Sequence, residues 1–583
     1  MSDSDSQGFQ DFQDLRALAA ERKALRREPE RIGIPAIEPC ILRVLMVTDD
    51  RMGFDERDFS FQELVAALRE IELPHVVVKV ETAHRRGGAG ASIRGPFRFD
   101  PDVLASYDEL WLMGFEFGDE QRISDAERRA IVDFMDAGKG VFSTGDHEDI
   151  GSAMSADLPR IRSMRRWYFP PEITFFRMEV GDVPDRLHGR RVAPPFTGPR
   201  RHDTVRLRDG ELPNFNDQSD DLAQMIVPLM YQRRPGRDFQ PWGYPHPILS
   251  GQHGPIRYLP DHPHEGDCHL PDKLDELFTI PASPGVERYK ADEYPLDAFG
   301  RRVAPEVIAF SDNGPGVDWQ FKGPVPEKRY GAIAAYDGQR AGIGRVAVSA
   351  TWHHFLNLNL RGRARDDEGP WAFGFRATRR GMKYFGEIKA FYSNLLIWLL
   401  PDVGHRCVGW RALWNAAWDQ SVRMSLRRVD SLEELQVEHL IFAGQGARHL
   451  LGDIAGSCQA LIWTIDNIPP DLRAVFLGPI LPDGPLLGPV DPAIGKRLDK
   501  AGSDPISREL AANAVDAALG AMIYRIFLDF DSDEKSVARA SGIHDAREYL
   551  EPAVRHALGL CAEQAKARIA SARAHQKLAA ERL

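Results

Sequence analysis

The sequence predicts an α/β protein, built on a doubly wound parallel sheet of the flavodoxin-like type and followed by an α-helical C-terminal region. Three observations lead to this prediction. Short apolar runs alternate with helical patterns over about the first 150 residues, which is the order that gives a parallel sheet. Acidic and polar residues follow the ends of these runs, as they do at the carboxyl ends of strands in such sheets. From about residue 430 onward, the pattern is mainly helical.

Hydrophobic periodicity assigns the elements in order. Apolar runs predict buried strands at 41–48, 75–80, 107–113, 141–144 and 345–350. Apolar residues recur on one face over 61–71, which predicts a helix. A second helix begins at a capping box formed by Ser124 and Glu127 and ends at Gly138. A third helix, rich in aromatic residues, is predicted over 371–400.

Changes in composition divide the chain into four parts. They are an N-terminal tail or helix at 1–38, the α/β domain at 39–360, an aromatic-rich helical packing segment at 361–429 and the helical C-terminal region at 430–583. Within the α/β domain, residues 152–245 are rich in Arg and Pro and are predicted to be an insertion over the site. Trp410, Trp414 and Trp418 recur at four-residue spacing on one helical face, which favours packing over a cofactor role.

Composition narrows the class of protein. The chain has 583 residues, with 74 Lys and Arg against 86 Asp and Glu, so its net charge is −12 and general nucleic-acid binding is not favoured. The five cysteines are far apart and in no CxxC pattern, which predicts free thiols in a reducing cytosol rather than a disulfide framework. The polar N-terminus and the short apolar runs predict a cytoplasmic protein without a membrane span.

The stretch from Lys139 to Gly151 is the centre of the predicted site. It is a buried strand that runs into a turn carrying four ionisable side chains in a row, Asp146, His147, Glu148 and Asp149. Because the carboxyl ends of parallel strands share one edge of the sheet, we expect polar residues from the other strand ends to meet this turn.

The residues from Arg43 to His147 resemble the class I glutamine amidotransferase-like fold, and within it the ThuA-like branch of uncharacterised bacterial proteins. The resemblance is carried by the segments 44–49, 113–116, 124–127, 138–145 and, near the end of the α/β domain, Thr351-Trp-His-His354. It implies a late strand that delivers a histidine to the site. Ser143 stands where amidotransferases carry a cysteine nucleophile, so glutaminase activity is not expected. Val141 replaces the first glycine of the Gly-x-Ser-x-Gly elbow of serine peptidases.

A metal site is the first functional hypothesis. The candidate ligands are Asp146, His147, His262, His264 and His353. They fall at predicted strand ends or adjacent turns, and three or four such nitrogen and oxygen ligands suit a divalent metal, Zn²⁺ first. The bound metal would activate water or polarise a carbonyl. The alternative is that these histidines cap turns and satisfy buried backbone groups.

A second hypothesis is nucleophilic catalysis by Ser143. His353 or His354 would serve as its base, and Glu265 or Asp261 would orient the imidazole. The alternative is that Ser143 only ends a strand. A serine in a strand-to-helix turn gains backbone N–H donors for an oxyanion, so the two possibilities stay open.

Substrate-binding candidates complete the site. Arg165 and Arg166, in the arginine-rich insertion, are candidates to clamp an anionic group, or else form a solvated face. Asp49, Asp50 and Glu116 follow predicted strands and would line the pocket or cap helices. The sequence has no GxGxxG after its first strand and no Walker A motif, so no nucleotide cofactor is expected.

These observations together favour a metal-assisted hydrolase. Its substrate would be a polar small molecule or conjugate with an amide, ester or glycosidic bond. The alternative is a catalytically inert ligand-binding or sensor module, whose helical C-terminus mediates signalling or assembly into a homo-oligomer.

Overall fold

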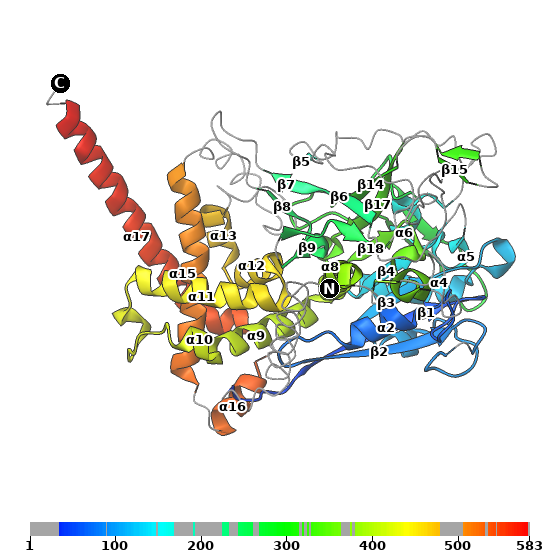
Figure 1. The fold of residues 1–583 in the computed structure, drawn as a ribbon, viewed down its shortest axis with the longest axis horizontal. Helices are drawn as coiled ribbons and strands as arrows, with labels where there is room; N and C mark the ends of the chain where they lie inside the picture. The colour runs from blue at the N-terminus through cyan, green and yellow to red at the C-terminus, as the bar shows by residue number, and fades with distance from the viewer. Residues whose placement is uncertain are drawn as a thin grey trace, which may run out of the picture.

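The structure, a computed structural model, places a broad β-sheet beside a bundle of helices (Figure 1). It describes residues 34–88, 90–146, 150–167, 191–192, 224–232, 243–252, 254–260, 267–313, 317–319, 323–325, 328–362, 374–375, 379–477, 505–530, 534–543 and 545–580. The sheet and the helices that cover it determine where the candidate site lies.

The central sheet has nine strands. Five are parallel, in the order β2 (Val76–His84), β1 (Cys40–Thr48), β3 (Glu109–Met113), β4 (Gly140–Thr144) and β18 (Val346–Ser349). Four antiparallel strands extend the sheet from β18, in the order β17 (Lys328–Tyr336), β14 (Glu306–Asn313), β6 (Gln224–Pro228) and β11 (Tyr258–Leu259). The predicted α/β class and the five predicted strands are thereby confirmed.

Both faces of the sheet are covered, because alternate residues of each strand enter different cores. In β1, Val44 and Met46 join the core shared with α2 (Gln62–Arg69) and α8 (Arg379–Leu399). Leu45 and Val47 join the opposite core, with α4 (Asp125–Asp136).

The predicted start of α4 is confirmed. The Ser124 hydroxyl accepts a hydrogen bond from the Glu127 amide, and the Glu127 carboxylate accepts one from the Ser124 amide. This reciprocal cap satisfies two backbone donors that a helix start leaves open.

Shorter elements fill the rest of the α/β part. The helical turns are α3 (Pro101–Leu104), η2 (Asp119–Gln121), α5 (Ser152–Ser155), α6 (Ile161–Met164), η4 (Pro247–Leu249), η5 (Gly338–Ala341), η6 (Trp352–His354) and α7 (Asn357–Arg361). The small sheets pair β5 (Arg191–Val192) with β7 (Met230–Gln232) and β8 (Gly243–Pro245), β9 (Ser250–Gly251) with β10 (Gly254–Pro255), β12 (Leu277–Ile280) with β13 (Tyr289–Asp292), and β15 (Val317–Trp319) with β16 (Gly323–Val325).

The C-terminal part is helical, as predicted. Its helices are α9 (Asp402–Trp418), α10 (Gln420–Arg423), η8 (Leu432–Glu434), α11 (Val437–Ala455), α12 (Ser457–Asp466), α13 (Pro470–Leu477), α15 (Pro505–Asp529), α16 (Glu534–Ser541) and α17 (Ala546–Ala580). The core on the α8 face of the sheet continues without a break into these helices. Figure 1 shows α17 projecting beyond the bundle.

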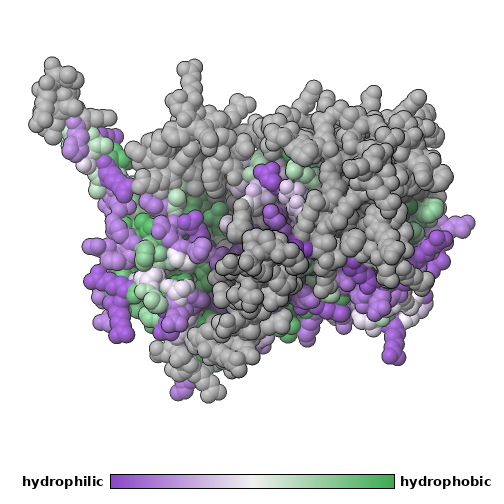
Figure 2. Space-filling model, viewed as in Figure 1, coloured by the Kyte–Doolittle hydropathy of each residue, from purple (hydrophilic) through white to green (hydrophobic). Residues whose placement is uncertain are grey.

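Helix α15 is the central helix of this bundle. Its segment Leu510–Asp529 is long and apolar enough to cross a membrane, but 72% of the apolar window is buried inside the protein. Gly444 of α11 and Gly520 of α15 bring the two backbones close, because a Cβ on Gly520 would lie 1.9 Å from the carbonyl oxygen of Leu440. Figure 2 shows apolar surface among polar residues over the bundle, and Phe442 of α11 is 62% exposed.

Two tryptophan contacts confirm the predicted packing face of α9. The rings of Trp410 and Trp414 lie 6.3 Å apart, and those of Trp414 and Trp418 lie 5.6 Å apart. All three side chains are buried in the core that joins the sheet to the helices.

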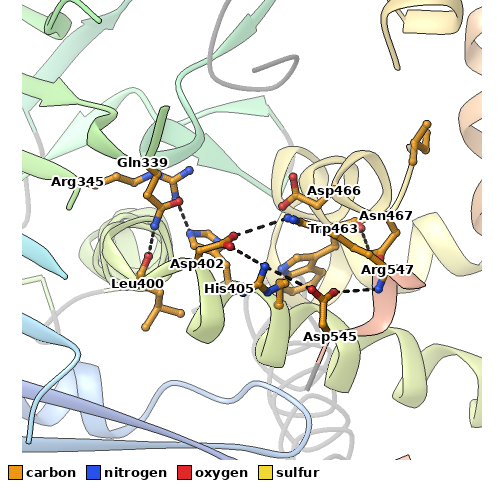
Figure 3. Close-up of polar contacts among 12 residues, drawn as sticks. Gln339, Arg345, Leu400, Asp402, His405, Trp463, Asp466, Asn467, Asp545 and Arg547 are labelled. Atoms are coloured by element: carbon orange, nitrogen blue, oxygen red, sulfur yellow. Dashed lines mark hydrogen bonds and ion pairs between the residues drawn. The ribbon is translucent and has the colours of Figure 1, made fainter. Parts of the chain in front are cut away.

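A disulfide and a polar cluster mark the junction between the sheet and the helices. Cys40, the first residue of β1, forms a disulfide with Cys407 of α9, so the predicted set of free cysteines is wrong for this pair. The two residues are 367 positions apart, and only the fold brings them together. In the polar cluster, Arg345, the residue before β18, lies 2.6 Å from the imidazole of His405 in α9 (Figure 3).

Candidate functional site

The candidate site lies at the carboxyl edge, the end of the sheet where its five parallel strands finish. The last residues of these strands are Thr48, His84, Met113, Thr144 and Ser349. The turns that follow them carry Asp49, Arg86, Glu116, Asp146 and His353. Because the five strands are parallel neighbours, these turns lie along one edge of the sheet.

Asp146 and His353 meet because β4 and β18 are neighbouring parallel strands. Thr144 pairs with Ser349, so the residues two positions further along, Asp146 and Thr351, face each other across the edge. The Thr351 hydroxyl donates to Asp146 Oδ1 at 2.6 Å. Asp146 Oδ2 lies 3.7 Å from His353 Nε2. Both side chains are buried, with 1% of Asp146 and none of His353 exposed.

The His353 imidazole is held on its other side by α7. Its Nδ1 lies 3.0 Å from the amide oxygen Oδ1 of Asn359, and its backbone N–H donates to the Thr351 hydroxyl at 3.1 Å. An amide oxygen only accepts hydrogen bonds, so Nδ1 carries a proton in this arrangement. Nε2 is then the nitrogen that can exchange a proton on the side facing Asp146.

Arg165 fastens the two turns together. Its buried guanidinium donates to the backbone oxygen of Asp146 and, at 3.1 Å, to that of Ala350, and it lies 4.2 Å from the Trp167 ring centroid. Burial lowers the pKa of Arg165 to about 10, so it remains a cation at neutral pH. Gly145 leaves room for this arrangement, because a Cβ there would be 2.8 Å from the Trp167 ring.

Asp49 is a second buried carboxyl group, after β1. Its Oδ1 accepts hydrogen bonds from the backbone N–H of Phe115 at 2.6 Å and of Glu116 at 3.0 Å. Its Oδ2 is buried and has no hydrogen-bond partner among the described residues. Burial raises the pKa of Asp49 from 3.8 to about 7, although the two amide donors act in the opposite direction. This carboxyl group therefore exchanges its proton near neutral pH, as a general acid or base does.

A large pocket opens beside these residues. It has a volume of about 960 Å³ and is lined by residues of the segment 51–59 together with Phe115; we call it the Phe115 pocket. The Phe115 ring stacks on Trp352 at 5.9 Å, and Phe59 meets the same indole edge-on at 6.0 Å. Trp352 in turn lies 4.4 Å from the His353 ring. An aromatic wall therefore connects the pocket to the histidine.

The remaining predicted residues occupy varied positions. Ser143 is buried, and its hydroxyl donates to Ser155 at 2.8 Å, with no histidine bonded to it among the described residues. His354 Nδ1 lies 3.0 Å from the Ser349 hydroxyl. The backbone of Arg166 donates to the carbonyl of Asp267 at 2.9 Å. Asp50 has a positive φ of 48° and lies 3.7 Å from Arg51.

Glu116, a predicted substrate-binding residue, and the remaining predicted metal ligands are the last to place. Glu116 is 7% exposed and forms an ion pair with Arg86 at 2.5 Å. His147, His262, His264 and Glu265 lie outside the described residues. Within the described ranges, no group of three or more His, Cys, Asp and Glu side chains is arranged to hold a metal ion. Of the predicted ligands, Asp146 and His353 are the two that the described structure brings together.

Sequence reasoning missed Thr351, Asn359 and Trp352, which surround His353. A signal for Asn359 was present, since Trp-His-His is followed by two asparagines at 357 and 359. Asn357 instead joins α7 to the first turn of α2, where its amide oxygen accepts from the Glu63 N–H at 2.9 Å, and its amide nitrogen donates to the carbonyl of Asp55 in the loop before α2 at 2.9 Å. The sequence gives no means of separating the roles of these two asparagines.

Comparison with known proteins adds no family to this description. No protein-family model matches the chain, and no curated protein is significantly similar to it. The functional argument therefore depends on the geometry of the carboxyl edge.

Proposed function

We propose that the protein is a hydrolase that activates water at the pair formed by Asp146 and His353. The observation that carries the proposal is the chain Asn359–His353–Asp146, in which the histidine Nδ1 is held by an amide oxygen and its Nε2 lies 3.7 Å from a carboxylate oxygen. Such an arrangement keeps one nitrogen ready to take or give a proton. The 3.7 Å between Asp146 Oδ2 and His353 Nε2 exceeds a direct hydrogen bond, which suits a third atom held between them.

The proposed third atom is a divalent metal or a water molecule. Asp146 and His353 have the ligand types that Zn²⁺ prefers, and His147, His262 and His264 are the proposed further ligands. With zinc, the bound water would ionise near neutral pH. Without it, His353 would act directly as the base, and Asp49 would supply a second proton-exchanging group.

The Phe115 pocket supports a polar small molecule as the substrate. Its volume of about 960 Å³ is in the range of small-molecule sites. Phe59 and Phe115 offer aromatic faces to a ring, and the acidic and basic residues of 51–59 offer polar contacts. We propose an amide, ester or glycosidic bond as the one cleaved.

We further propose that the five parallel strands are a doubly wound, flavodoxin-like sheet of the amidotransferase-like kind. The strand order β2-β1-β3-β4-β18 and the presence of helices on both faces support this proposal. In that fold, ligands bind at the carboxyl edge, which is where the buried carboxyl groups and His353 lie.

One observation favours a second candidate, an inert ligand-binding or sensor module. His353 and Asp146 are buried almost completely, and the core beneath the sheet continues into the C-terminal helices. A ligand in the Phe115 pocket would then alter the helices without being cleaved.

The test uses the purified full chain with chromogenic esters, amides and glycosides, before and after chelation. We expect hydrolysis of one class, lost in His353→Ala and Asp146→Asn but unchanged in His449→Ala, which alters an exposed histidine of α11. Elemental analysis of the same three variants and the wild type decides between zinc and direct base catalysis. Turnover that survives in His353→Ala would overturn the proposal. Saturable ligand binding without any turnover would favour the sensor module.

A further inference from the structure

A second cavity lies beyond the end of β2 and is lined in part by Glu116, the residue after Phe115. It has a volume of about 750 Å³, and its walls come from the turn after β2, the segment 96–100, η2 and the start of α4; we call it the Arg98 pocket. Four arginines line it, Arg85, Arg86, Arg98 and Arg122. Arginines from three separate segments therefore converge on one hollow.

The four arginines differ in how far their charge is already neutralised. Arg85 is committed to the fold, because its guanidinium holds the buried carboxylate of Glu127 at 2.6 Å. Arg86 and Arg122 also have acidic neighbours, Glu116 at 2.5 Å and Asp157 at 2.9 Å. Their side chains keep 54% and 31% exposure, and Arg86 Nη2 also donates to the Gln121 amide oxygen at 2.9 Å.

Arg98 is the exception, since it has no carboxylate partner among the described residues. Its Nη1 donates to the backbone oxygens of Arg85 at 3.2 Å and of Phe97 at 3.1 Å. These two bonds fix the orientation of the guanidinium and leave its charge uncompensated. The edge formed by Nε and Nη2 has no hydrogen bond within the described part of the chain. That edge is the one that grips a carboxylate or phosphate with two parallel bonds.

The acidic residues of the pocket do not fill this role. Asp100 accepts from the Asp102 N–H at 2.9 Å as the cap of α3, and Glu127 caps α4. Glu120, which also lines the pocket, is the remaining acidic side chain there. It lowers the attraction for an anion, so its removal should strengthen binding.

We propose that the Arg98 pocket binds the phosphate or carboxylate group of a small anionic molecule. Arg98 takes the anion through its Nε and Nη2 edge, and Arg86 and Arg122, which line the same pocket, add positive charge. Anion binding at this pocket does not depend on catalysis. The further step, that the anion is part of the substrate, rests on the proposed hydrolase. Glu116 lines the Arg98 pocket, and its chain neighbour Phe115 lines the Phe115 pocket. A substrate that occupies both pockets would carry an anionic group and a ring.

Isothermal titration of the full chain at low ionic strength tests the proposal, with pyrophosphate and citrate as the probes. We expect saturable binding of at least one probe, and the preferred probe tells phosphate from carboxylate. Arg98→Ala should weaken that binding about tenfold or more. Arg94→Ala is the matched control, because Arg94 is exposed in the same loop and does not line the pocket. Glu120→Gln should tighten binding a few fold.

Three results would overturn the proposal: no saturable binding of either probe, equal weakening in Arg98→Ala and Arg94→Ala, or weaker binding in Glu120→Gln. The second would mean that the anion only responds to net charge. His353→Ala should bind the probe as the wild type does. The absence of hydrolysis with retained anion binding would contradict only the proposed hydrolase. Hydrolysis without anion binding would contradict only the proposed Arg98 pocket.

Discussion

Two buried histidines, His353 at the carboxyl edge and His405 at the junction with the helices, show how different a buried imidazole can be. Nε2 of His405 lies 2.6 Å from the Arg345 guanidinium and 3.4 Å from the Trp398 carbonyl (Figure 3). Burial and the Arg345 charge lower the pKa of His405 to about 3, so it stays neutral at ordinary pH. His353 faces a carboxylate, not a guanidinium.

The surroundings of the two histidines differ in a second way. Trp352, next to His353, forms a wall of aromatic contacts toward the Phe115 pocket. The His405 cluster is built from ion pairs and hydrogen bonds that join secondary structure elements, such as Arg345 with Asp337 at 2.8 Å. Burial alone therefore does not mark a functional histidine. Under the proposed function, the neighbouring carboxylate and the aromatic wall toward the Phe115 pocket are what distinguish His353 from His405.

The largest expected difference is in turnover. His353→Ala should lower kcat/KM by about a thousandfold once a substrate is found, since it removes the proposed proton-exchanging group. His405→Ala should leave kcat/KM of the folded protein near the wild-type value and lower its Tm instead. Steady-state kinetics and thermal unfolding of both variants check this pair of expectations. If His353→Ala and His405→Ala lost the same activity and had the same Tm, the two histidines would not differ in function.

The next effect concerns Asp49 and pH. Its carboxyl has a folded pKa of about 7 against an ordinary 3.8, so the folded state holds this proton where the unfolded state has lost it. Stability should then fall as pH rises from about 4 to about 7, and the contribution between pH 5 and pH 8 should be roughly 3 kcal/mol at most.

Asp49→Asn removes this dependence while its amide oxygen can still accept from Phe115 and Glu116. Denaturant unfolding at pH 5 and pH 8 should show a smaller loss of stability in the variant than in the wild type. An identical pH slope in both proteins would mean that Asp49 does not hold its proton in the folded state.

Arg345→Ala tests the junction itself. The guanidinium bonds Asp337, the Trp398 carbonyl at 2.8 Å and His405, and only 14% of the side chain is exposed. Its removal leaves several buried groups unpaired, so unfolding should become easier by about 3 kcal/mol. Chemical denaturation measures this, with exposed Arg428→Ala as the control that should change nothing. Activity of folded Arg345→Ala should match the wild type, and a selective loss of turnover would tie the junction to the carboxyl edge.

The elements of the sheet followed from local signals, whereas the partners within the site did not. Apolar runs and one capping box located β1, β3, β4 and α4, because these signals lie within a few residues of each other. The pairing of Asp146 with His353 was suggested only by strand-end topology, since 207 positions separate them. Thr351 and Asn359 were missed because their roles depend on the register of β4 against β18.

Arginine density in the sequence did not point to the proposed anion site, for a related reason. The sequence pointed to Arg165 because it lies in an arginine-rich segment, yet the fold aims its guanidinium at two backbone carbonyls. Arg98 lies in a loop, 89–99, that is rich in glycine and arginine and for which the sequence suggested no function. What separates the two is the set of acceptors around each guanidinium, which only the tertiary structure supplies.

The smallest expected effect is the loss of stability on removal of the disulfide between Cys40 and Cys407. It joins the start of β1 to α9 with Cα atoms 6.1 Å apart, two residues from His405 and at the end of β1 opposite to Asp49. Closing so long a loop restricts the unfolded chain, and Cys407→Ser should lower stability by about 2 kcal/mol. Denaturant unfolding of this variant, and of the wild type with and without a reductant, measures the loss. Because the bond is at the far end of the strand, turnover and anion binding at 25 °C should not change. A loss of turnover or of anion binding in folded Cys407→Ser would show that the junction and the carboxyl edge act as one unit. The two histidines would then belong to a single coupled site.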